Sequence, residues 1–299
     1  MEKAPKIIDG KQIASEIKKE LAQEVIALLD EGKRPPHLVA VIVGEDGASQ
    51  SYVASKEKQS KEVGFMSSVY SFPETLTEEE LLNTVDFLNN DNEVDGFIVQ
   101  LPLPKHINEQ KVIERINYKK DVDGFHPMNC GRLMNNMPSF LPATPFGVMT
   151  MLERAQVDTV GKHCVVVGRS NIVGTPMSVL MSRNHSNANC TVTLCHSKTN
   201  NLKEICLSAD ILIVAIGKPE FITKEMVKDG AVVIDVGIHR IEDTTKEKGY
   251  RIVGDVKFDE VAPKCSQITP VPGGVGLLTV VSLLQNTLKA YKHEIYPED

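Results

Sequence analysis

The chain has 299 residues, of which 41% are hydrophobic and 24% charged, and its formal net charge is −7. This length predicts two domains at roughly 150 residues each. The acidic balance argues against a nucleic-acid partner, which normally requires a basic surface. No uncharged apolar stretch reaches the ~18 residues that a membrane span needs, so we expect no membrane partner.

The cysteines and the N-terminal residues indicate in which cellular compartment we expect the protein. None of the six cysteines forms a Cys-x-x-Cys pair, and residues 1–9 carry charges and a proline where a signal peptide would be apolar. We therefore expect reduced thiols in a cytoplasmic protein, with neither disulfides nor a zinc site.

The first half of the chain alternates helix-like and strand-like segments. Apolar residues recur at helical spacing in 11–29, and Thr77-Glu78-Glu79-Glu80 is typical of a helix start. This alternation predicts a mostly parallel sheet covered by helices. The predicted helices are 11–29, 50–63 and 77–88, and the predicted strands are 38–43, 69–72 and 96–101.

The second half repeats the alternation of strand, glycine-containing turn and helix that is typical of a Rossmann-like domain. We place the domains at 1–145 and 146–276, with the last helix free to return to the first domain. The predicted strands are 163–167, 191–195, 210–216 and 231–236, and the predicted helices are 146–155, 176–183 and 277–291.

A turn with two glycines joins a predicted strand to a predicted helix. Gly168 and Gly174 are present, but the middle glycine of G-x-G-x-x-G is missing. Pro176 suits the first turn of a helix, whose backbone N–H groups could bind a phosphate. We favour nucleotide binding; the alternative is a plain turn in which the glycines only relieve steric crowding.

The next predicted strand indicates which nucleotide would bind. NAD sites usually have an acidic residue at its end, whereas this strand ends in Cys195-His196-Ser197-Lys198. A hydroxyl and a cation suit a 2′-phosphate, and Arg169 could supply a second cation. This favours NADP; the alternative is that Ser197 and Lys198 merely begin a solvated loop.

Tyr52 and Lys56 are four residues apart and share one face of a predicted helix. They could transfer a proton if the pKa of the lysine falls far below ~10.4. The alternative is an amphipathic surface helix. Short-chain dehydrogenases use this spacing after their glycine turn, but here the pair precedes the turn, which excludes that family.

Further polar residues lie where ligands bind α/β proteins. Gln100 closes an apolar strand, so its amide needs partners. Asp121 and Asp123 flank a glycine turn; they are either turn formers or carboxylates able to grip a ring edge with N–H donors. His126 and His196 lack metal-ligand companions, so we interpret both as structural or loop residues.

Seven segments, in order along the chain, resemble the bifunctional methylenetetrahydrofolate dehydrogenase/methenyltetrahydrofolate cyclohydrolase family. Together they cover the chain from near residue 50 to past residue 275, and each alone would be weak. The segments are 51–56, 99–104, 120–125, 168–174, 191–197, 233–238 and 269–276.

The resemblance implies an α/β fold with an N-terminal folate-binding catalytic domain, completed by residues 277–299, and a C-terminal Rossmann-like NADP-binding domain. It also implies a cleft between the domains and a homodimer. The implied reactions oxidise 5,10-methylenetetrahydrofolate with NADP⁺ and hydrolyse the methenyl product to 10-formyltetrahydrofolate. Because no P-loop motif is present, we expect two activities and no synthetase activity.

The resemblance also assigns residues. It makes Lys56 the general acid/base, packs Tyr52 on the aminobenzoyl ring, orients Lys56 through Gln100 and holds the pterin edge with Asp123. The other implied substrate residues are Val99, Leu101, Pro270, Val271, Pro272, Gly273, Gly274, Val275 and Gly276. The implied NADP residues are Gly168, Arg169, Ser170, Ser197 and Ile238.

Two departures from the family pattern stand out. Ala143 replaces a common cysteine, which cannot be essential here, and Leu277-Leu278 replaces Pro-Met, which bears on folate and inhibitor fit. Two rival functions remain. One is a shikimate-dehydrogenase-like NADP oxidoreductase; the other is a non-enzymatic NADP-sensing module, which would not need Tyr52, Lys56, Gln100 and Asp123 to converge.

Overall fold

The computed structural model describes residues 6–246 and 248–297, apart from the side chain of residue 48, and the chain divides into two compact units. The three-stranded unit comprises Ser15–Ala143 and the chain from Val280 onward. The six-stranded unit comprises Thr144–Thr279 and the N-terminal segment that ends at Ala14. This division differs from the expected boundary of 1–145, because the first strand pairs within the six-stranded sheet.

A parallel sheet in the order β3-β2-β4 forms the centre of the three-stranded unit. The strands are β2 (His37–Val43), β3 (Met66–Phe72) and β4 (Gly96–Val99). Every residue of β2 and β4 is buried. This explains why both sequences are continuous apolar runs without alternation, as expected for central parallel strands.

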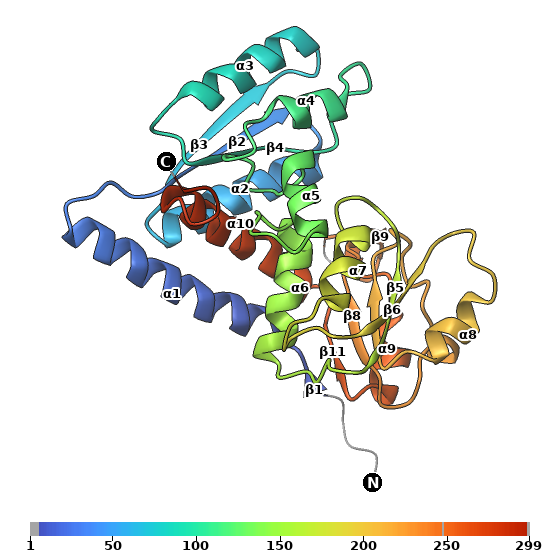
Figure 1. The fold of residues 1–299 in the computed structure, drawn as a ribbon. Coiled ribbons are helices and arrows are strands. Elements are labelled where there is room, and N and C mark those ends of the chain that lie inside the picture. Colours follow the sequence, from blue (N-terminus) through green and yellow to red (C-terminus); the bar gives the residue numbers. More distant parts are fainter. Residues whose placement is uncertain (1–5, 247, 298–299) are drawn as a thin grey trace. The chain divides into compact units, whose positions relative to one another are not determined.

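Helices cover both faces of this sheet, with α3 and α4 on one face and α2 and α10 on the other (Figure 1). Leu81, Val85 and Leu88 of α3 recur at helical spacing and pack on Val39 and Val41. The capping box at Thr77 is present, as predicted. The helices are α1 (Gly10–Asp30), α2 (Gly47–Glu62), α3 (Glu78–Asn90), α4 (Glu109–Arg115), α5 (Pro127–Met134) and α10 (Val275–Tyr291).

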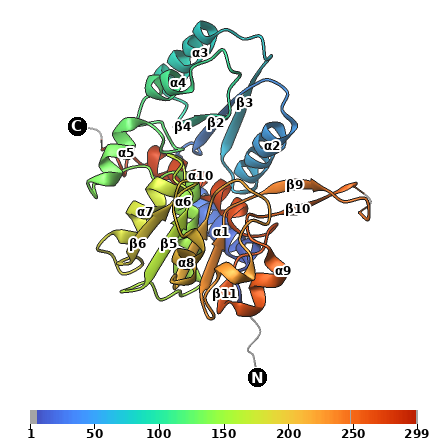
Figure 2. The same ribbon diagram turned by 90° about the vertical axis from the view of Figure 1, so that its right-hand side faces the viewer.

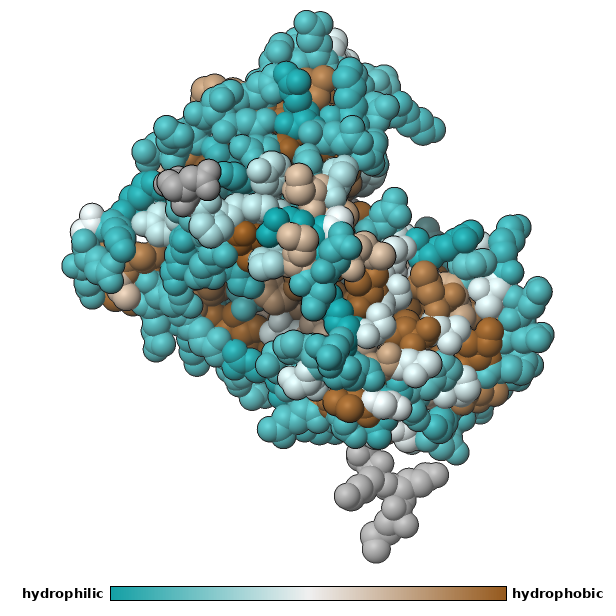
Figure 3. Space-filling view, in the orientation of Figure 1, coloured by the Kyte–Doolittle hydropathy of each residue, from teal (hydrophilic) through white to brown (hydrophobic). Residues whose placement is uncertain are grey.

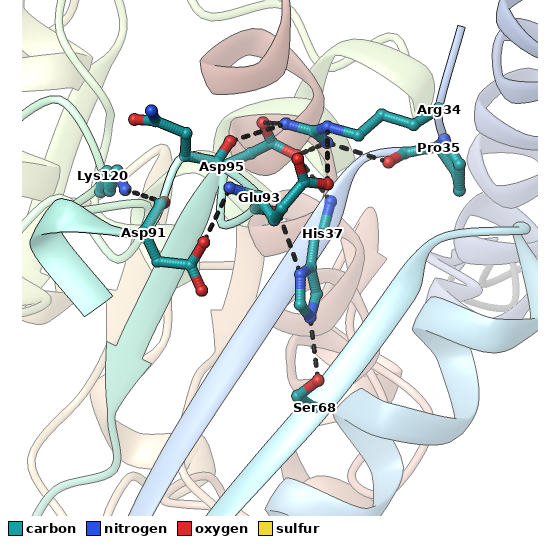
Figure 4. Close-up of polar contacts among 9 residues, drawn as sticks. Arg34, Pro35, His37, Ser68, Asp91, Glu93, Asp95 and Lys120 are labelled. Carbon is teal, nitrogen blue, oxygen red and sulfur yellow. Dashed lines mark hydrogen bonds and ion pairs between the residues drawn. The ribbon is translucent and has the colours of Figure 1, made fainter. Parts of the chain in front are cut away.

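A polar network joins the strand ends opposite Gln100 (Figure 4). Both terminal nitrogens of Arg34 donate to Asp95 at 2.8 Å, and Asp95 also accepts the backbone N–H of His37 at 2.7 Å. The His37 ring lies 2.9 Å from the Ser68 hydroxyl. Lys120 donates to two backbone carbonyls at the C-terminal end of α3, those of Leu88 and Asp91. These charged groups therefore hold the fold together at this edge.

The six-stranded unit contains one parallel sheet in the order β1-β11-β8-β7-β5-β6. The chain runs from β5 to β6 at the edge of the sheet (Figure 2). It then returns to β7 on the other side of β5. This reversal creates the topological switch point at which doubly wound sheets bind ligands. The strands are β1 (Lys6–Ile7), β5 (His163–Val167), β6 (Thr191–Cys195), β7 (Ile211–Val214), β8 (Val232–Asp235) and β11 (Gln267–Ile268).

Short helices and one hairpin complete this unit. Its surface in Figure 3 shows hydrophobic residues scattered among polar ones, and the exposed hydrophobic residues include Ile172, Leu194 and Phe221. Among the described residues, no helix is long and apolar enough to cross a membrane. The remaining elements are α6 (Ala143–Arg154), α7 (Gly174–Ser182), α8 (Leu202–Leu207), α9 (Phe258–Val261), the 3₁₀ turns Lys224–Met226 and Ala262–Lys264, and the antiparallel pair β9 (His239–Glu242) and β10 (Tyr250–Val253).

The predicted strands and long helices occur in the structure with shifted ends, whereas several short elements were not predicted. The missed elements include α4, α5, α8 and the β9–β10 hairpin. Each is too short to show a clear apolar period. The last helix starts at Val275, two residues before the predicted start, so it includes part of the predicted substrate loop.

A buried asparagine attaches α10 to the three-stranded unit. Asn286 is 1% exposed, and its amide nitrogen donates to the carbonyls of Val122 at 2.8 Å and Leu141 at 2.9 Å. We predict that Asn286→Ala lowers the free energy of unfolding by about 2–4 kcal/mol, because both carbonyls lose their donor. Urea denaturation followed by circular dichroism measures this change.

The matched control is Asn90→Ala, which removes one exposed bond to the carbonyl of Asp86 in the same unit. Its effect should stay within about 0.5 kcal/mol. Equal midpoints for the two variants would contradict the anchoring role of Asn286.

Candidate active site

Tyr52, Lys56 and Gln100 meet at the carboxyl end of the three-stranded sheet. Lys56 on α2 donates from Nζ to Oε1 of Gln100, the residue after β4, at 3.1 Å. The same ammonium lies 4.8 Å from the centre of the Tyr52 ring, one helical turn away. Gln100 is held in turn, because its amide nitrogen donates to the Leu101 carbonyl at 2.7 Å. Its acceptor oxygen therefore faces Lys56.

Burial favours the neutral form of the Lys56 side chain. Only 5% of the residue is exposed, and loss of water around the ammonium lowers its pKa from the usual range despite the opposing charge of Asp123. A lysine with a lowered pKa can supply a neutral amine and act as a base. The alternative of an amphipathic surface helix is therefore wrong at this position.

Asp123 approaches this group from the loop that follows α4. Burial raises the pKa of its carboxyl group, the charge of Lys56 opposes this rise, and the charge of Asp121 adds to it. Asp121 is different in kind, since its carboxylate accepts the backbone N–H groups of Phe125 and His126 at 3.2 and 2.8 Å. Asp121 thus stabilises the turn, whereas Asp123 interacts electrostatically with Lys56.

The two histidines differ. The ring of His126 accepts the N–H of Met128 at 3.0 Å and caps α5, so it is structural, as expected. His196 accepts the N–H of Lys198 at 3.2 Å and also lines the pocket described below. Among the described residues, no group of three or more His, Cys, Asp or Glu side chains could hold a metal ion.

In the six-stranded unit, two glycines permit close packing of the turn after β5. Gly168 has a φ of +121°, and a Cβ there would lie 2.1 Å from the carbonyl oxygen of Ala215. A Cβ on Gly174 would lie 1.9 Å from the carbonyl oxygen of Gly168. Both glycines are therefore required. The Ser170 hydroxyl accepts the N–H of Gly174 at 3.4 Å, so it occupies one donor at the start of α7.

A pocket of about 270 Å³ lies at the carboxyl ends of β5, β6 and β7. It brings together four of the five predicted cofactor residues, whereas Ile238 is 66% exposed and does not line it. Lys218 and Phe221 line it as well; neither residue was predicted, because no sequence motif marks the end of β7. Its lining residues are Val167, Gly168, Arg169, Ser170, His196, Ser197, Leu202, Ala215, Ile216, Lys218 and Phe221.

The predicted substrate residues fall into two groups. Val99 and Leu101 flank Gln100 beside Lys56, in the three-stranded unit. The others, from Pro270 to Gly276, follow β11 in the six-stranded unit, and the last two form the first turn of α10. The two departures from the family pattern, Ala143 and Leu277-Leu278, lie at the starts of α6 and α10.

A second pocket of about 1070 Å³ lies beside the network of Figure 4, away from Lys56. Several of its charged side chains pair with one another: Arg34 pairs with Asp95, and Lys292 pairs with Glu24. None of the predicted site residues lines it, so its size alone does not make it the candidate site.

The fold and these two groups of residues define a nucleotide-dependent α/β enzyme with a doubly wound binding unit and a separate acid–base cluster. Models of the tetrahydrofolate dehydrogenase/cyclohydrolase family match residues 8–123 as its catalytic domain and 142–295 as its NAD(P)-binding domain. The chain belongs to this family. It is accordingly an enzyme with the dehydrogenase and cyclohydrolase activities that define the family, and the shikimate-dehydrogenase-like and sensor alternatives are not favoured.

Known proteins of this family are similar to this chain over nearly its whole length. The bifunctional protein FolD of Cytophaga hutchinsonii is 60% identical over 284 residues, which cover 95% of this chain and 98% of that protein. The FolD crystal structure from Campylobacter jejuni has a TM-score of 0.91 and 45% identity, with 97% and 100% coverage. The Trypanosoma brucei enzyme, complexed with NADP cofactor and inhibitor, has a TM-score of 0.92 and 37% identity, with 99% and 100% coverage.

The close approach at Gly174 yields a prediction. Gly174→Ala should raise the Kd for NADP⁺ by about 10-fold or more, because the added methyl group displaces the turn between β5 and α7. Fluorescence titration of NADPH into the purified variant measures this change. Gly131→Ala is the control, since a Cβ there meets nothing within 4 Å. Unchanged affinity in Gly174→Ala would show that the turn does not contact the cofactor.

Proposed function

We propose that Lys56, Tyr52, Gln100 and Asp123 carry the folate chemistry of this enzyme, and that the 270 Å³ pocket holds part of NADP. The observation that carries the proposal is the burial of the Lys56 ammonium against Gln100. A sensor would gain nothing from a desolvated lysine, because burying its charge costs free energy. A proton shuttle, in contrast, needs a lysine whose pKa is lowered by desolvation, because the amine must take up and release a proton near neutral pH.

The pocket fits NADP better than NAD. No carboxylate follows β6, where an NAD site would place one on the ribose hydroxyls. Arg169 and Ser197 are both exposed at the pocket and can contact a 2′-phosphate through a charge-assisted bond and a hydroxyl. Gly168 and Ser170 form the turn beside which a pyrophosphate would lie, and Ile238 follows the neighbouring strand β8. When bound, the cofactor accepts the hydride.

In the first reaction, 5,10-methylenetetrahydrofolate loses a hydride and becomes the methenyl cation. No proton passes to the protein in this step, so the protein contributes alignment of the reacting carbons. Tyr52 offers an aromatic face for the aminobenzoyl ring, and the carboxylate of Asp123 can accept N–H groups of the pterin edge. Val99 and Leu101 border this site, and Pro270 to Gly276 complete the proposed substrate contacts.

In the second reaction, water adds to the methenyl carbon and the ring opens to 10-formyltetrahydrofolate. The neutral amine of Lys56 takes a proton from the attacking water, and the resulting ammonium returns this proton to the departing ring nitrogen. The second proton of the water leaves to solvent as the C–N bond breaks and the hydroxyl becomes the formyl carbonyl. Gln100 accepts a hydrogen bond from Nζ of Lys56 and so orients this nitrogen. The lowered pKa of Lys56 makes its neutral form available, and the positive charge of the substrate acts in the same direction.

We propose further that the enzyme works in the cytoplasm as a homodimer on tetrahydrofolate derivatives. All six cysteines are free thiols, which supports a reducing compartment. Size-exclusion chromatography with light scattering measures the oligomer.

Arg169 tests the choice of cofactor. Arg169→Ala should raise the KM for NADP⁺ by about 10-fold or more and the KM for NAD⁺ by less than about 3-fold, because only the 2′-phosphate loses a charge-assisted contact. Steady-state dehydrogenase assays with both cofactors give the two values. Equal losses would count against a contact with the 2′-phosphate.

Lys56 separates the two reactions. Lys56→Met should lose cyclohydrolase activity by ~10²–10⁴-fold, as for a missing general acid/base, while dehydrogenase activity falls less. Tyr52→Phe should be milder in both reactions, because its ring remains. Hydrolysis of methenyltetrahydrofolate and formation of NADPH are measured on the same preparation.

Lys61→Met is the matched control, because Lys61 lies on the same helix but pairs with Glu57 at the surface. Both its activities should equal those of the wild type. Full hydrolysis in a folded Lys56→Met protein would overturn the proposed mechanism.

A further inference from the structure

A buried carboxylate in the six-stranded unit holds one wall of the cofactor pocket. Asp255 has no exposed surface. One of its oxygens accepts the backbone N–H groups of Ile216 at 2.8 Å and Gly217 at 3.1 Å. The other accepts the N–H of Lys218 at 2.8 Å and the Nε2–H of His239 at 2.7 Å. Three successive amides thus converge on one carboxylate.

These amides belong to the turn that follows β7. Ile216 and Lys218 line the pocket together with Gly168 and Ser197, which come from the ends of the neighbouring strands. Asp255 itself does not line the pocket. It can therefore affect a bound cofactor only through the shape of this turn.

A second carboxylate fixes the position of Asp255. Asp235, at the end of β8, accepts the backbone N–H groups of Asp255 at 3.0 Å and Val256 at 2.9 Å. Its own N–H donates to the Thr269 hydroxyl at 2.8 Å. The order of contacts therefore runs from the central sheet through Asp235 to Asp255, and from Asp255 to the pocket wall.

Stability alone does not require this arrangement. Burying a carboxylate costs free energy, and a turn at the surface could leave its amides to water. Gly217 and Lys218 are exposed residues, yet their amides point inward to Asp255. Because the amides are held by Asp255, the backbone of the turn is held in one shape, and with it the part of the pocket wall that Ile216 and Lys218 form.

We propose that Asp255 is a positioning residue for the dinucleotide: it presets the 216–218 turn, and His239 shares the carboxylate with that turn. This inference rests on the proposed function, in which the pocket holds NADP. Because Asp255 acts through backbone shape and not through the 2′-phosphate, its loss should weaken NADP⁺ and NAD⁺ alike. Arg169→Ala should instead weaken NADP⁺ selectively.

The test variant is Asp255→Asn, in which an NH₂ group replaces one acceptor oxygen and faces N–H donors. The Kd values for NADP⁺ and NAD⁺ should both rise by about 10- to 100-fold, since a buried bond to a charged acceptor is lost. Hydrolysis of methenyltetrahydrofolate needs no NADP and should stay within about 2-fold. Hydrogen exchange at the amides of residues 216–218 should quicken, while exchange along β5 stays slow.

Asp210→Asn is the matched control. Asp210 also accepts a backbone N–H in this unit, from His163 at 2.9 Å, but at the amino end of β5. Its cofactor affinities should remain within about 2-fold of the wild type. Asp255→Glu keeps the charge on a longer side chain and should show a several-fold loss for both cofactors; it decides the question if Asp255→Asn does not fold.

Several outcomes would overturn the inference: unchanged affinity in Asp255→Asn despite faster exchange of the three amides, a loss confined to NADP⁺, or an equal loss in Asp210→Asn. Wild-type protein that binds no NADP⁺ would instead overturn the proposed function. The exchange measurements would still test the role of Asp255 in the turn, so the two failures are distinguishable.

Discussion

Parallel strands place every following loop at the same edge of a sheet, and both functional regions of this protein depend on that constraint. In the three-stranded unit, β4 ends directly before Gln100, which then faces Lys56 on the helix after β2. In the six-stranded unit, the strand order reverses between the adjacent strands β5 and β7, so the crevice lies between the loops that follow these two strands. An antiparallel arrangement would send alternate loops to opposite edges and separate these residues.

The chemistry adds an electrostatic cost to this geometry. Lys56 and Asp123 are both desolvated. Burial lowers the pKa of Lys56 and raises the pKa of Asp123, so each shift favours the neutral group, although the attraction between the two charges opposes both shifts. In the proposed mechanism, this desolvation is what allows Lys56 to act as a base, because a lysine in water would be protonated at neutral pH. Asp255 shows a structural use of a buried aspartate: it accepts hydrogen bonds from four donors and does not line the pocket.

The parts of this fold that could be predicted from sequence are those with strong local signals. The apolar runs of β2, β5 and β8 and the capping box at Thr77 require no knowledge of distant residues. The bond between Lys56 and Gln100 joins residues 44 positions apart, so its geometry needed the structure, although the family resemblance pointed to it. Asp255 had no signal, because its partners lie about 40 residues earlier and no motif marks them.

The division of the chain also has a consequence for how the protein is made. Each unit is assembled from two separate stretches of sequence, and the three-stranded unit includes the chain from Val280 onward. Asn286 is therefore synthesised 164 and 145 residues after Val122 and Leu141, whose carbonyls it binds, so this contact forms late in synthesis. Synthesis from the N-terminus cannot complete one unit and then the other, and no single cut in the chain separates them. A gene encoding either unit alone would need two segments joined by a new linker.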